Sequence, residues 1–189
     1  LGIADASQFQ KPILLGQLDL PGDATDVAVD SNLRIAAVAA NVGGLHLVNV
    51  ADPMQPMLRQ TIPGPATQVE VFNGVIYAAF GNTLRAYDLL TGEFLQSLAP
   101  SGSVFTGLVR EGSFLYTMDA SLTLRVIDIS SASGFPMAAR GSRVMPAGGG
   151  RLFVGNGIAY VAAEFSFSFT GGFATTDVSN PDSLTVLSG

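Results

Sequence analysis

One oxygen-bearing side chain recurs along the chain, each time as the last residue of a pentapeptide. The five pentapeptides are LGIAD, LHLVN, LRAYD, LRVID and FATTD, which end at Asp5, Asn49, Asp88, Asp128 and Asp177. The intervals between these marker residues are 44, 39, 40 and 49 residues. Carboxylates and carboxamides repeated in this way have two chemistries open to them. They can bind a metal or substrate jointly, or each can accept hydrogen bonds from the backbone of its own turn.

The repeat favours separate turn caps over a shared site. One marker in each repeating unit distributes the residues over the units and does not gather them. Asp and Asn at a strand end can accept hydrogen bonds from the N–H groups of the following turn. We therefore predict structural turn caps at Asp5, Asn49, Asp88, Asp128 and Asp177, each worth about 1 kcal/mol. We predict no catalytic residue and no metal ligand among them.

The segments that position these residues have the pattern of a β-propeller. A period of roughly 40 to 45 residues with four short strands per unit is typical of propeller blades, and no stretch has helical periodicity over three turns. We predict an all-β fold of four-stranded antiparallel blades, with about four and a half blades present. Residues 1–20 would form the second half of a preceding blade, followed by blades at 21–63, 64–100, 101–146 and 147–189. Because the chain begins within a unit, we interpret it as a piece of one larger propeller domain.

Turn residues and tyrosines recur at matching positions in the last three blades. The expected two-residue hairpin turns are Asn73-Gly74, Glu111-Gly112 and Asn156-Gly157, since Asn and Gly tolerate positive φ. The second strand of each of these blades carries a tyrosine: Tyr77, Tyr116 and Tyr160. The first blade has Ala36 at that position. We expect the rings to fill the space between neighbouring sheets.

Composition excludes several classes of protein. Charged residues make up 13% and apolar residues 48% of the 189 residues, which excludes a disordered chain. The net charge is −6, and one Lys and eight scattered Arg form no basic cluster, which argues against nucleic acid. The most apolar run, 35–51, contains polar residues and falls short of the roughly 20 apolar residues of a membrane span. The lack of cysteine leaves secretion open, because strand pairing and core packing need no disulfides.

The marker segments resemble the LVIVD repeat, whose unit ends in a Leu-Val-Ile-Val-Asp strand and a Ser-Asp-Pro turn. LGIAD, LHLVN, LRAYD and LRVID carry the resemblance, together with Asp52-Pro53 and with Ser179-Asn180-Pro181. It covers the whole chain, although FATTD departs from the pattern and Leu90-Thr91-Gly92-Glu93 replaces one proline turn. The resemblance implies a β-propeller of a bacterial or archaeal secreted or surface-attached protein. That family has no assigned chemistry of its own.

Three other groups of residues invite a functional interpretation. The densest acidic group is Asp19, Asp23, Asp26 and Asp30; calcium would be its cofactor, but no compact Asp-x-Asp-x-Asp-Gly loop is present, so a solvated rim is favoured. His46 is the single histidine, and without cysteine or a nucleophile motif it is interpreted as neither metal ligand nor catalyst. The run Gly148-Gly149-Gly150-Arg151 precedes a strand, whereas a phosphate-binding glycine loop precedes a helix. It is therefore interpreted as a linker.

The segment 164–172 departs from the repeat. Tyr160 and Asp177 are 17 residues apart, whereas the equivalent intervals in the two preceding blades are 11 and 12. Alternating Phe and Ser would place Phe165, Phe167 and Phe169 on one face of a strand. An exposed apolar patch of this kind is typical of a contact surface, so these rings are candidate partner contacts. The alternative is that they pack against a neighbouring blade or domain of the same polypeptide.

These patterns favour a non-enzymatic propeller module of a larger extracellular or cell-surface prokaryotic protein. It would act as a structural scaffold or a protein-interaction platform, with a protein or a neighbouring domain as partner and without nucleic acid, membrane span or cofactor. The alternative is a propeller that frames an enzyme active site, of a hydrolase or a quinone-type oxidoreductase, with catalytic residues outside this chain. A carbohydrate-binding surface is disfavoured, because 0 Trp and 4 Tyr provide few aromatic platforms.

Overall fold

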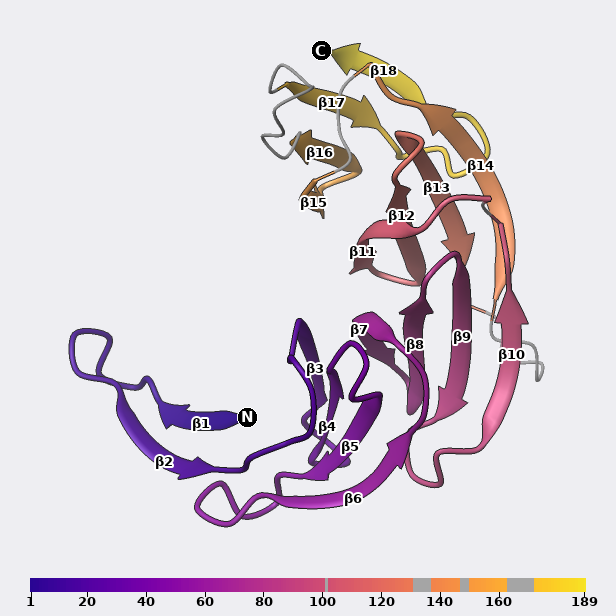
Figure 1. Cartoon of the computed structure of the whole chain (residues 1–189). Coiled ribbons are helices and arrows are strands. Elements are labelled where there is room, and N and C mark those ends of the chain that lie inside the picture. Colours follow the sequence, from indigo (N-terminus) through magenta and orange to yellow (C-terminus); the bar gives the residue numbers. More distant parts are fainter. Residues whose placement is uncertain (101, 131–136, 147–149, 163–171) are drawn as a thin grey trace. The chain divides into compact units, whose positions relative to one another are not determined.

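The computed structural model describes residues 1–100, 102–130, 137–146, 150–162 and 172–189. All elements of regular secondary structure in these ranges are β-strands (Figure 1). The strands are 4 to 7 residues long. They are rich in Val, Ile, Leu, Phe and Thr, and Asn, Gly, Asp and Pro lie in the turns between them. β-Branched and aromatic residues fit a pleated surface, and the turn residues stop each strand after a few positions.

Consecutive strands form one two-stranded sheet and four four-stranded sheets, with antiparallel pairing throughout the recorded registers. The two-stranded sheet contains β1 (Gly2–Asp5) and β2 (Ile13–Gln17). The first four-stranded sheet contains β3 (Asp26–Asp30), β4 (Ile35–Ala39), β5 (Leu45–Asn49) and β6 (Met57–Ile62). The second contains β7 (Ala66–Phe72), β8 (Val75–Phe80), β9 (Thr83–Asp88) and β10 (Phe94–Leu98). The all-β prediction and the four-stranded sheets are confirmed.

The remaining two sheets have the same sequential order. The third contains β11 (Phe105–Glu111), β12 (Phe114–Asp119), β13 (Thr123–Asp128) and β14 (Ala138–Val144). The fourth contains β15 (Leu152–Gly155), β16 (Ile158–Ala162), β17 (Phe173–Asp177) and β18 (Thr185–Ser188). The marker residues end β1, β5, β9, β13 and β17. Each marker pentapeptide therefore lies on the third strand of a sheet, or on β1.

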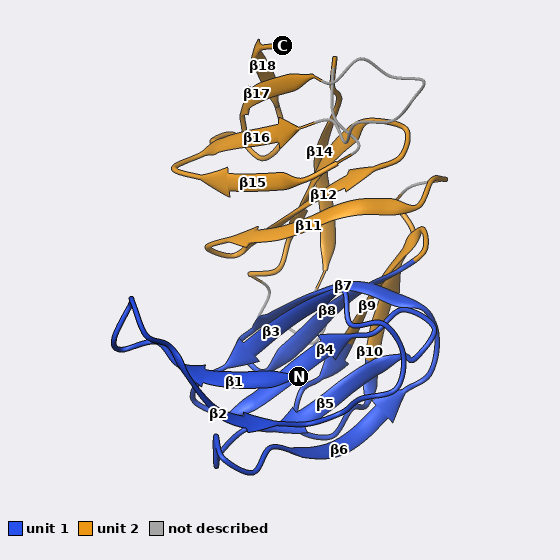
Figure 2. Cartoon of the chain, turned by 60° about the vertical axis from the view of Figure 1, so that its left-hand side comes forward, with its two compact units in different colours: residues 1–80, 87–94 blue, residues 81–86, 95–189 orange. Residues whose placement is uncertain are grey.

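The chain divides into two compact units (Figure 2). Unit 1 comprises residues 1–80 and 87–94, and unit 2 comprises residues 81–86 and 95–189. The boundary passes through β9, so it does not coincide with a boundary between sheets. The sequence did not predict this division.

Two of the three predicted hairpin turns lie at the predicted residues. Asn73-Gly74 and Asn156-Gly157 have positive φ at both residues (49° and 75°, 56° and 73°), as a two-residue type I′ turn requires. The third prediction was wrong by one residue. Glu111 pairs with Phe114, so the turn is Gly112-Ser113. Gly112 has φ 58° and supplies positive φ at the first turn position, where a type II′ turn needs glycine, and Glu111 stays in the strand.

The sheet of β3 to β6 is covered on both faces by apolar side chains of unit 1. On one face Ile35, Ala37 and Leu47 belong to a buried cluster with residues of β7 to β9. On the other face Ala36, Val38 and Val48 are buried, and Leu1, Leu18 and Leu20 pack against them. All five residues of β4 are consequently buried. Burial on both faces explains why this strand is an uninterrupted apolar run with no polar alternation.

In unit 2 the core lies between the sheet of β11 to β14 and the sheet of β15 to β18. Its buried residues include Tyr116, Met118 and Val126 from the first of these sheets and Val154 and Ala159 from the second. Tyr116 is 3% exposed and fills the space between the two sheets, as predicted for its position. Burial raises the pKa of the Tyr116 phenol above its ordinary value, and nearby Glu111 raises it further.

The strand register shows that the prediction of Ala36 at the tyrosine position of the first four-stranded sheet was wrong. Tyr116 pairs with Val126, and Tyr160 pairs with Thr175; both partners lie two residues before a marker residue. In β5 the residue two positions before the marker Asn49 is Leu47, and it pairs with Ala37. Ala37, and not Ala36, therefore occupies the tyrosine position. An alanine carries no sequence signal that would have revealed the offset.

Candidate interaction surface

Each marker residue accepts a hydrogen bond from the backbone N–H two positions later. The N–H donors and their distances are Ser7 to Asp5 (2.8 Å), Ala51 to Asn49 (2.9 Å), Leu90 to Asp88 (2.9 Å), Ser130 to Asp128 (2.8 Å) and Ser179 to Asp177 (2.9 Å). This is the geometry of an Asx turn. Each side chain thus closes the turn behind its own strand, and the five are bound locally.

The turn hydrogen bonds stabilise the ionised form of four marker carboxylates. The pKa of Asp5 and of Asp88 is lowered chiefly by backbone donation, from Ser7 and from Thr91. The pKa of Asp128 and of Asp177 is lowered chiefly by a serine hydroxyl, from Ser130 and from Ser179. A hydrogen bond to the charged form always favours that form. None of these shifts requires a nearby metal or a reacting group.

Two members of the acidic group around β3 also bind backbone. Oδ1 of Asp30 accepts hydrogen bonds from the N–H groups of Asn32 and Leu33, both at 2.9 Å. Oδ2 of Asp26 accepts the N–H of Val69 at 2.9 Å, which connects β3 to β7. Within the described ranges, no three His, Cys, Asp or Glu residues lie close enough together to hold a metal ion.

His46 is fully buried and links two segments of unit 1. Its Nε2 lies 2.9 Å from the carbonyl oxygen of Pro21, and its Nδ1 lies 2.8 Å from Oγ1 of Thr61. A carbonyl only accepts, so Nε2 carries the hydrogen and the Thr61 hydroxyl can donate to Nδ1. Both ring nitrogens are used in holding β5 against the segment before β3 and against β6.

A buried carboxylate that sequence reasoning missed lies at the end of β12. Asp119 is completely buried. Its Oδ1 accepts the N–H of Ser121 (2.9 Å), the Ser121 hydroxyl (2.6 Å) and the N–H of Thr123 (3.0 Å), and its Oδ2 forms an ion pair with Arg125. The signal was the run Asp119-Ala-Ser121-Leu-Thr123-Leu-Arg125, in which an acid is followed by hydroxyls and a base at alternate positions. The carboxylate holds the β12–β13 turn together.

Arg140 connects two turns of unit 2 through carboxylates. It donates from Nε and Nη2 to both oxygens of Asp182 (2.7 and 2.6 Å) and from Nη1 to Oδ2 of Asp128 (3.0 Å). These hydrogen bonds lower the pKa of Asp182. A pocket of about 140 Å³ beside β13 and β14 is lined by Arg125 and Arg140 among others. It is smaller than the roughly 300–1,000 Å³ typical of ligand sites, and both arginines already have carboxylate partners.

The most distinctive surface of unit 2 is a row of exposed aromatic rings across three strands, which we call the aromatic face. It consists of Phe153 on β15, Tyr160 on β16 and Phe173 on β17, which are 63%, 37% and 56% exposed. Ring centroids are 5.9 Å apart between Phe153 and Tyr160 and 6.4 Å apart between Tyr160 and Phe173. These distances are within the range of favourable aromatic pairs.

Register, and not sequence proximity, brings these three rings together. Phe153 pairs directly with Tyr160, and Phe173 is diagonal to Tyr160 because it pairs with Ala162. The tyrosines at the equivalent position of β8 and β12, Tyr77 and Tyr116, are 1% and 3% exposed, and burial raises the pKa of Tyr77 to about 12. Tyr160 occupies the same position on β16 and is 37% exposed.

The predicted partner contacts lie outside the described residues. Phe165, Phe167 and Phe169 belong to the segment 163–171, which joins β16 to β17. Residues 147–149 of the predicted linker are also outside the described part, and Gly150 and Arg151 lead into strand β15. No helix of the described chain is long and apolar enough to cross a membrane.

Solved structures show which architecture these sheets belong to. BamB from Moraxella catarrhalis aligns with 92% of this chain at 13% identity and a TM-score of 0.67. Sqt1 from Saccharomyces cerevisiae aligns with 88% of it at 8% identity and a TM-score of 0.67. Both are β-propellers. The fold is a β-propeller.

The chain is also similar to a designed protein, and it covers about half of each natural one. The computationally designed Ika4 protein aligns with 84% of this chain at 17% identity and a TM-score of 0.61, over 95% of its own length. The chain spans 52% of the BamB chain and 47% of the Sqt1 chain. No protein-family model matches the sequence, and no curated protein matches it. The likeness therefore concerns the propeller fold.

Proposed function

We propose that the chain is a non-enzymatic β-propeller module that serves as a scaffold and protein-interaction platform, with the aromatic face as its contact with a protein partner or with a neighbouring domain of the same polypeptide. The observation that carries the proposal is the exposure of Phe153, Tyr160 and Phe173 on one sheet face. Aromatic residues are enriched in the buried centres of protein interfaces. A tyrosine combines a large apolar ring with a hydroxyl that can bond to a partner, so the row offers both apolar area and one polar contact.

The area of the row indicates that it is an anchor and not a whole interface. Each aromatic side chain can bury roughly 150–250 Å², so covering the exposed part of three rings removes on the order of 300 Å² from water. At about 25 cal/mol per Å² this is worth ~7 kcal/mol before association costs of ~4–15 kcal/mol. A stable interface buries about 800 Å² on each partner. The partner must therefore extend beyond the row.

The chemistry of the other candidate residues supports a binding role. The marker residues are each bonded within one turn, and His46 and Asp119 are buried in structural hydrogen bonds. The net charge of −6 favours a protein partner over nucleic acid. The proposed setting is a secreted or surface-attached prokaryotic protein, and the resemblance of the marker segments to the LVIVD repeat supports it.

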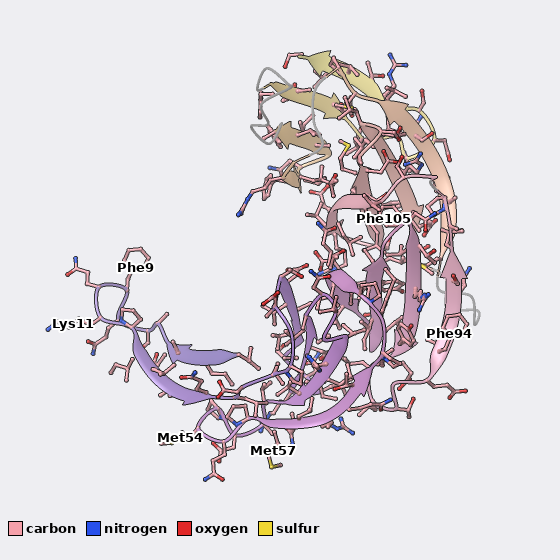
Figure 3. The ribbon with its side chains drawn as sticks, viewed as in Figure 1. Phe9, Lys11, Met54, Met57, Phe94 and Phe105 are labelled. Atoms are coloured by element: carbon pink, nitrogen blue, oxygen red, sulfur yellow. The ribbon has the colours of Figure 1, made fainter. Side chains whose placement is uncertain are left out.

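Photo-crosslinking in the cells that produce the polypeptide tests the proposal. A photoreactive phenylalanine analogue replaces Phe153 in one version and Phe9 in another. Phe9 is the matched control because it is 94% exposed and points away from the strands, in the loop between β1 and β2 (Figure 3). We expect irradiation to produce protein adducts at position 153 and not at position 9. Equal adducts at both positions, or none at position 153, would contradict the proposal.

A further inference from the structure

Two of the five methionines are exposed, and they lie three residues apart. Met54 in the turn after β5 is 67% exposed, and Met57 at the start of β6 is 59% exposed. Figure 3 shows both residues at this corner, with the sulfur of Met57 directed away from β6. The adjacent Leu58 is 42% exposed. We call Met54, Met57 and Leu58 the methionine corner. The other three methionines are 4% exposed or less: Met118, Met137 and Met145.

The turn that carries Met54 packs in the same way as the turn between β17 and β18. A Cβ added at Gly16 of β2 would lie 3.0 Å from the carbonyl carbon of Met54, and a Cβ added at Gly141 of β14 would lie 3.0 Å from that of Asp182. Both contacts join the last strand of one sheet to the turn before the last strand of the next. Met54 therefore occupies the position of Asp182, a carboxylate bound to Arg140. The packing does not require an apolar side chain there.

Met57 also lies where other sheets have a small or polar residue. Met57 pairs with the marker Asn49, and Ala138 and Thr185 pair with the markers of their own sheets. All three residues opposite a marker are exposed. The position is thus open to solvent in each of these sheets, and the fold accepts alanine or threonine at it. Methionine at this position serves no packing need that the repeat imposes.

The methionine corner is exposed although elements of unit 1 flank it on both sides. On one side β2 packs against the backbone of its turn. On the other side Arg59 of β6 donates a hydrogen bond to the carbonyl of Leu90 at 3.2 Å, which places the β9–β10 turn beside β6. Asp52 holds the backbone of the corner, because its Oδ1 accepts the N–H of Met54 at 2.9 Å and its carbonyl accepts the N–H of Gln55 at 3.1 Å. A backbone fixed in this way reduces the ordering cost of binding.

The charge around the methionine corner selects a cationic partner. Unit 1 carries nine acidic and three basic residues, a net charge of −6, whereas unit 2 carries six of each. Asp52 and Glu93 are exposed in the two turns beside the corner, and Arg59 is the only basic residue of these turns and β6. Complementary charge guides and orients association. Methionine is unbranched and polarizable, so it adapts to apolar side chains of varied shape.

We propose that the methionine corner, with Asp52 and Glu93 beside it, is a docking site for a protein segment that carries Lys or Arg among apolar side chains. The apolar side chains of that segment cover Met54, Met57 and Leu58, and its cations face the two carboxylates. The negative charge of unit 1 disfavours nucleic acid and anionic lipid as occupants. The site shares no residue with the aromatic face, so either proposal can fail alone.

Methionine-methyl NMR of the intact chain tests the site, because each of the five methionines gives one signal. The chain is labelled with ¹³C at the methionine methyl groups, and Met54→Leu and Met57→Leu assign the two signals of the corner. The probe is an amphipathic peptide of sequence KLLKLLKKLLKLLK. We expect saturable shifts of the Met54 and Met57 signals, while the three buried methionines stay unmoved and act as internal controls. Binding should weaken at least about tenfold at high salt, because salt screens exposed charges.

Substitutions separate the apolar and the charged parts of the site. Fluorescence anisotropy of the labelled peptide should show at least about tenfold weaker binding by the triple variant Met54→Ser, Met57→Ser and Leu58→Ser. Val144→Ser is the matched control, because Val144 is 67% exposed on β14 in unit 2. It should bind like the unchanged chain, and both variants should keep its thermal midpoint. Asp52→Asn keeps the turn acceptor, removes the charge and should weaken binding.

Several results would overturn the proposal. The first is the absence of saturable shifts at Met54 and Met57, and the second is equal binding of the peptide ELLELLEELLELLE, in which every lysine is replaced by glutamate. Binding that Phe153→Ser, Tyr160→Ser and Phe173→Ser abolish and that the corner substitutions leave unchanged would assign the peptide to the aromatic face. Phosphatidylcholine vesicles that shift the same two signals would assign the corner to a lipid surface. Dimers of the chain alone that the corner substitutions abolish would assign it to a second copy.

Discussion

At the scale of single residues, the side chains with the most evident chemistry maintain the backbone. The clearest case is position Asn49, where an amide accepts the same turn hydrogen bond as the aspartates of the other repeats. An acceptor oxygen is therefore the requirement at this position, and charge is secondary. That inference could be made from the sequence, because one polar residue recurred at each predicted strand end.

The lowered pKa values of Asp5, Asp88, Asp128 and Asp177 predict acid sensitivity. A carboxylate whose pKa is lower in the folded than in the unfolded chain stabilises the fold fully above its unfolded pKa, here about 3.8. That contribution is lost as the pH falls through the folded value. We expect the thermal midpoint to fall below about pH 4. Replacing all four by asparagine should keep the fold at neutral pH and flatten this dependence, and an unchanged acid slope would contradict the assignment.

Asp119 is expected to contribute more to stability than any exposed ion pair. Asp119→Ala leaves Arg125 without its carboxylate and two backbone N–H groups without an acceptor. Breaking a buried pair in this way costs about 3–5 kcal/mol. Arg140→Ala is the comparison, because that side chain and Asp182 are 34% and 59% exposed, and exposed pairs contribute about 0–1 kcal/mol. Urea unfolding of both variants measures the difference; equal losses would show that burial of Asp119 does not matter.

At the scale of elements, the presence of the strands could be predicted from the sequence more accurately than their pairing register. The period, the apolar runs and the Asn-Gly turns predicted the sheets because each feature acts locally. Glu111 was misplaced because Gly112 can open a type II′ turn by itself, and Ala37 was missed because alanine carries no distinguishing signal. The aromatic face was not predicted, since Phe153 and Phe173 lie on different strands and only pairing with β16 aligns them.

The turn between β4 and β5 provides a test of backbone packing. A Cβ added at Gly43 would lie 2.1 Å from the carbonyl oxygen of Pro21, and backbone on both sides cannot move away cheaply. Gly43→Ala should therefore lower the free energy of unfolding by about 3 kcal/mol, at the upper end for overpacking. Gly102→Ala is the control, because no atom lies within 4 Å of the added Cβ. Chemical denaturation measures both, and similar stabilities of the two variants would contradict the described packing.

At the scale of the whole molecule, repetition explains the fold. A unit copied in tandem keeps core-type side chains at fixed positions of each sheet. Tyr160 is 37% exposed, whereas Tyr116 at the equivalent position is 3% exposed. The architecture was predictable from the period, but the exposure of a given repeat position was not, because it depends on which side chains of other strands pack against it.

The most direct test of the central claim is the affinity of the aromatic-face variant for the protein that crosslinks at position 153. The variant carries Phe153→Ser, Tyr160→Ser and Phe173→Ser, and isothermal titration calorimetry compares it with the unchanged chain and with Phe9→Ser. If the aromatic face anchors the partner, its Kd should rise at least about a hundredfold, or roughly 2.7 kcal/mol, with the fold retained by circular dichroism and Phe9→Ser without effect. An unchanged Kd, or loss of the fold, would contradict the account.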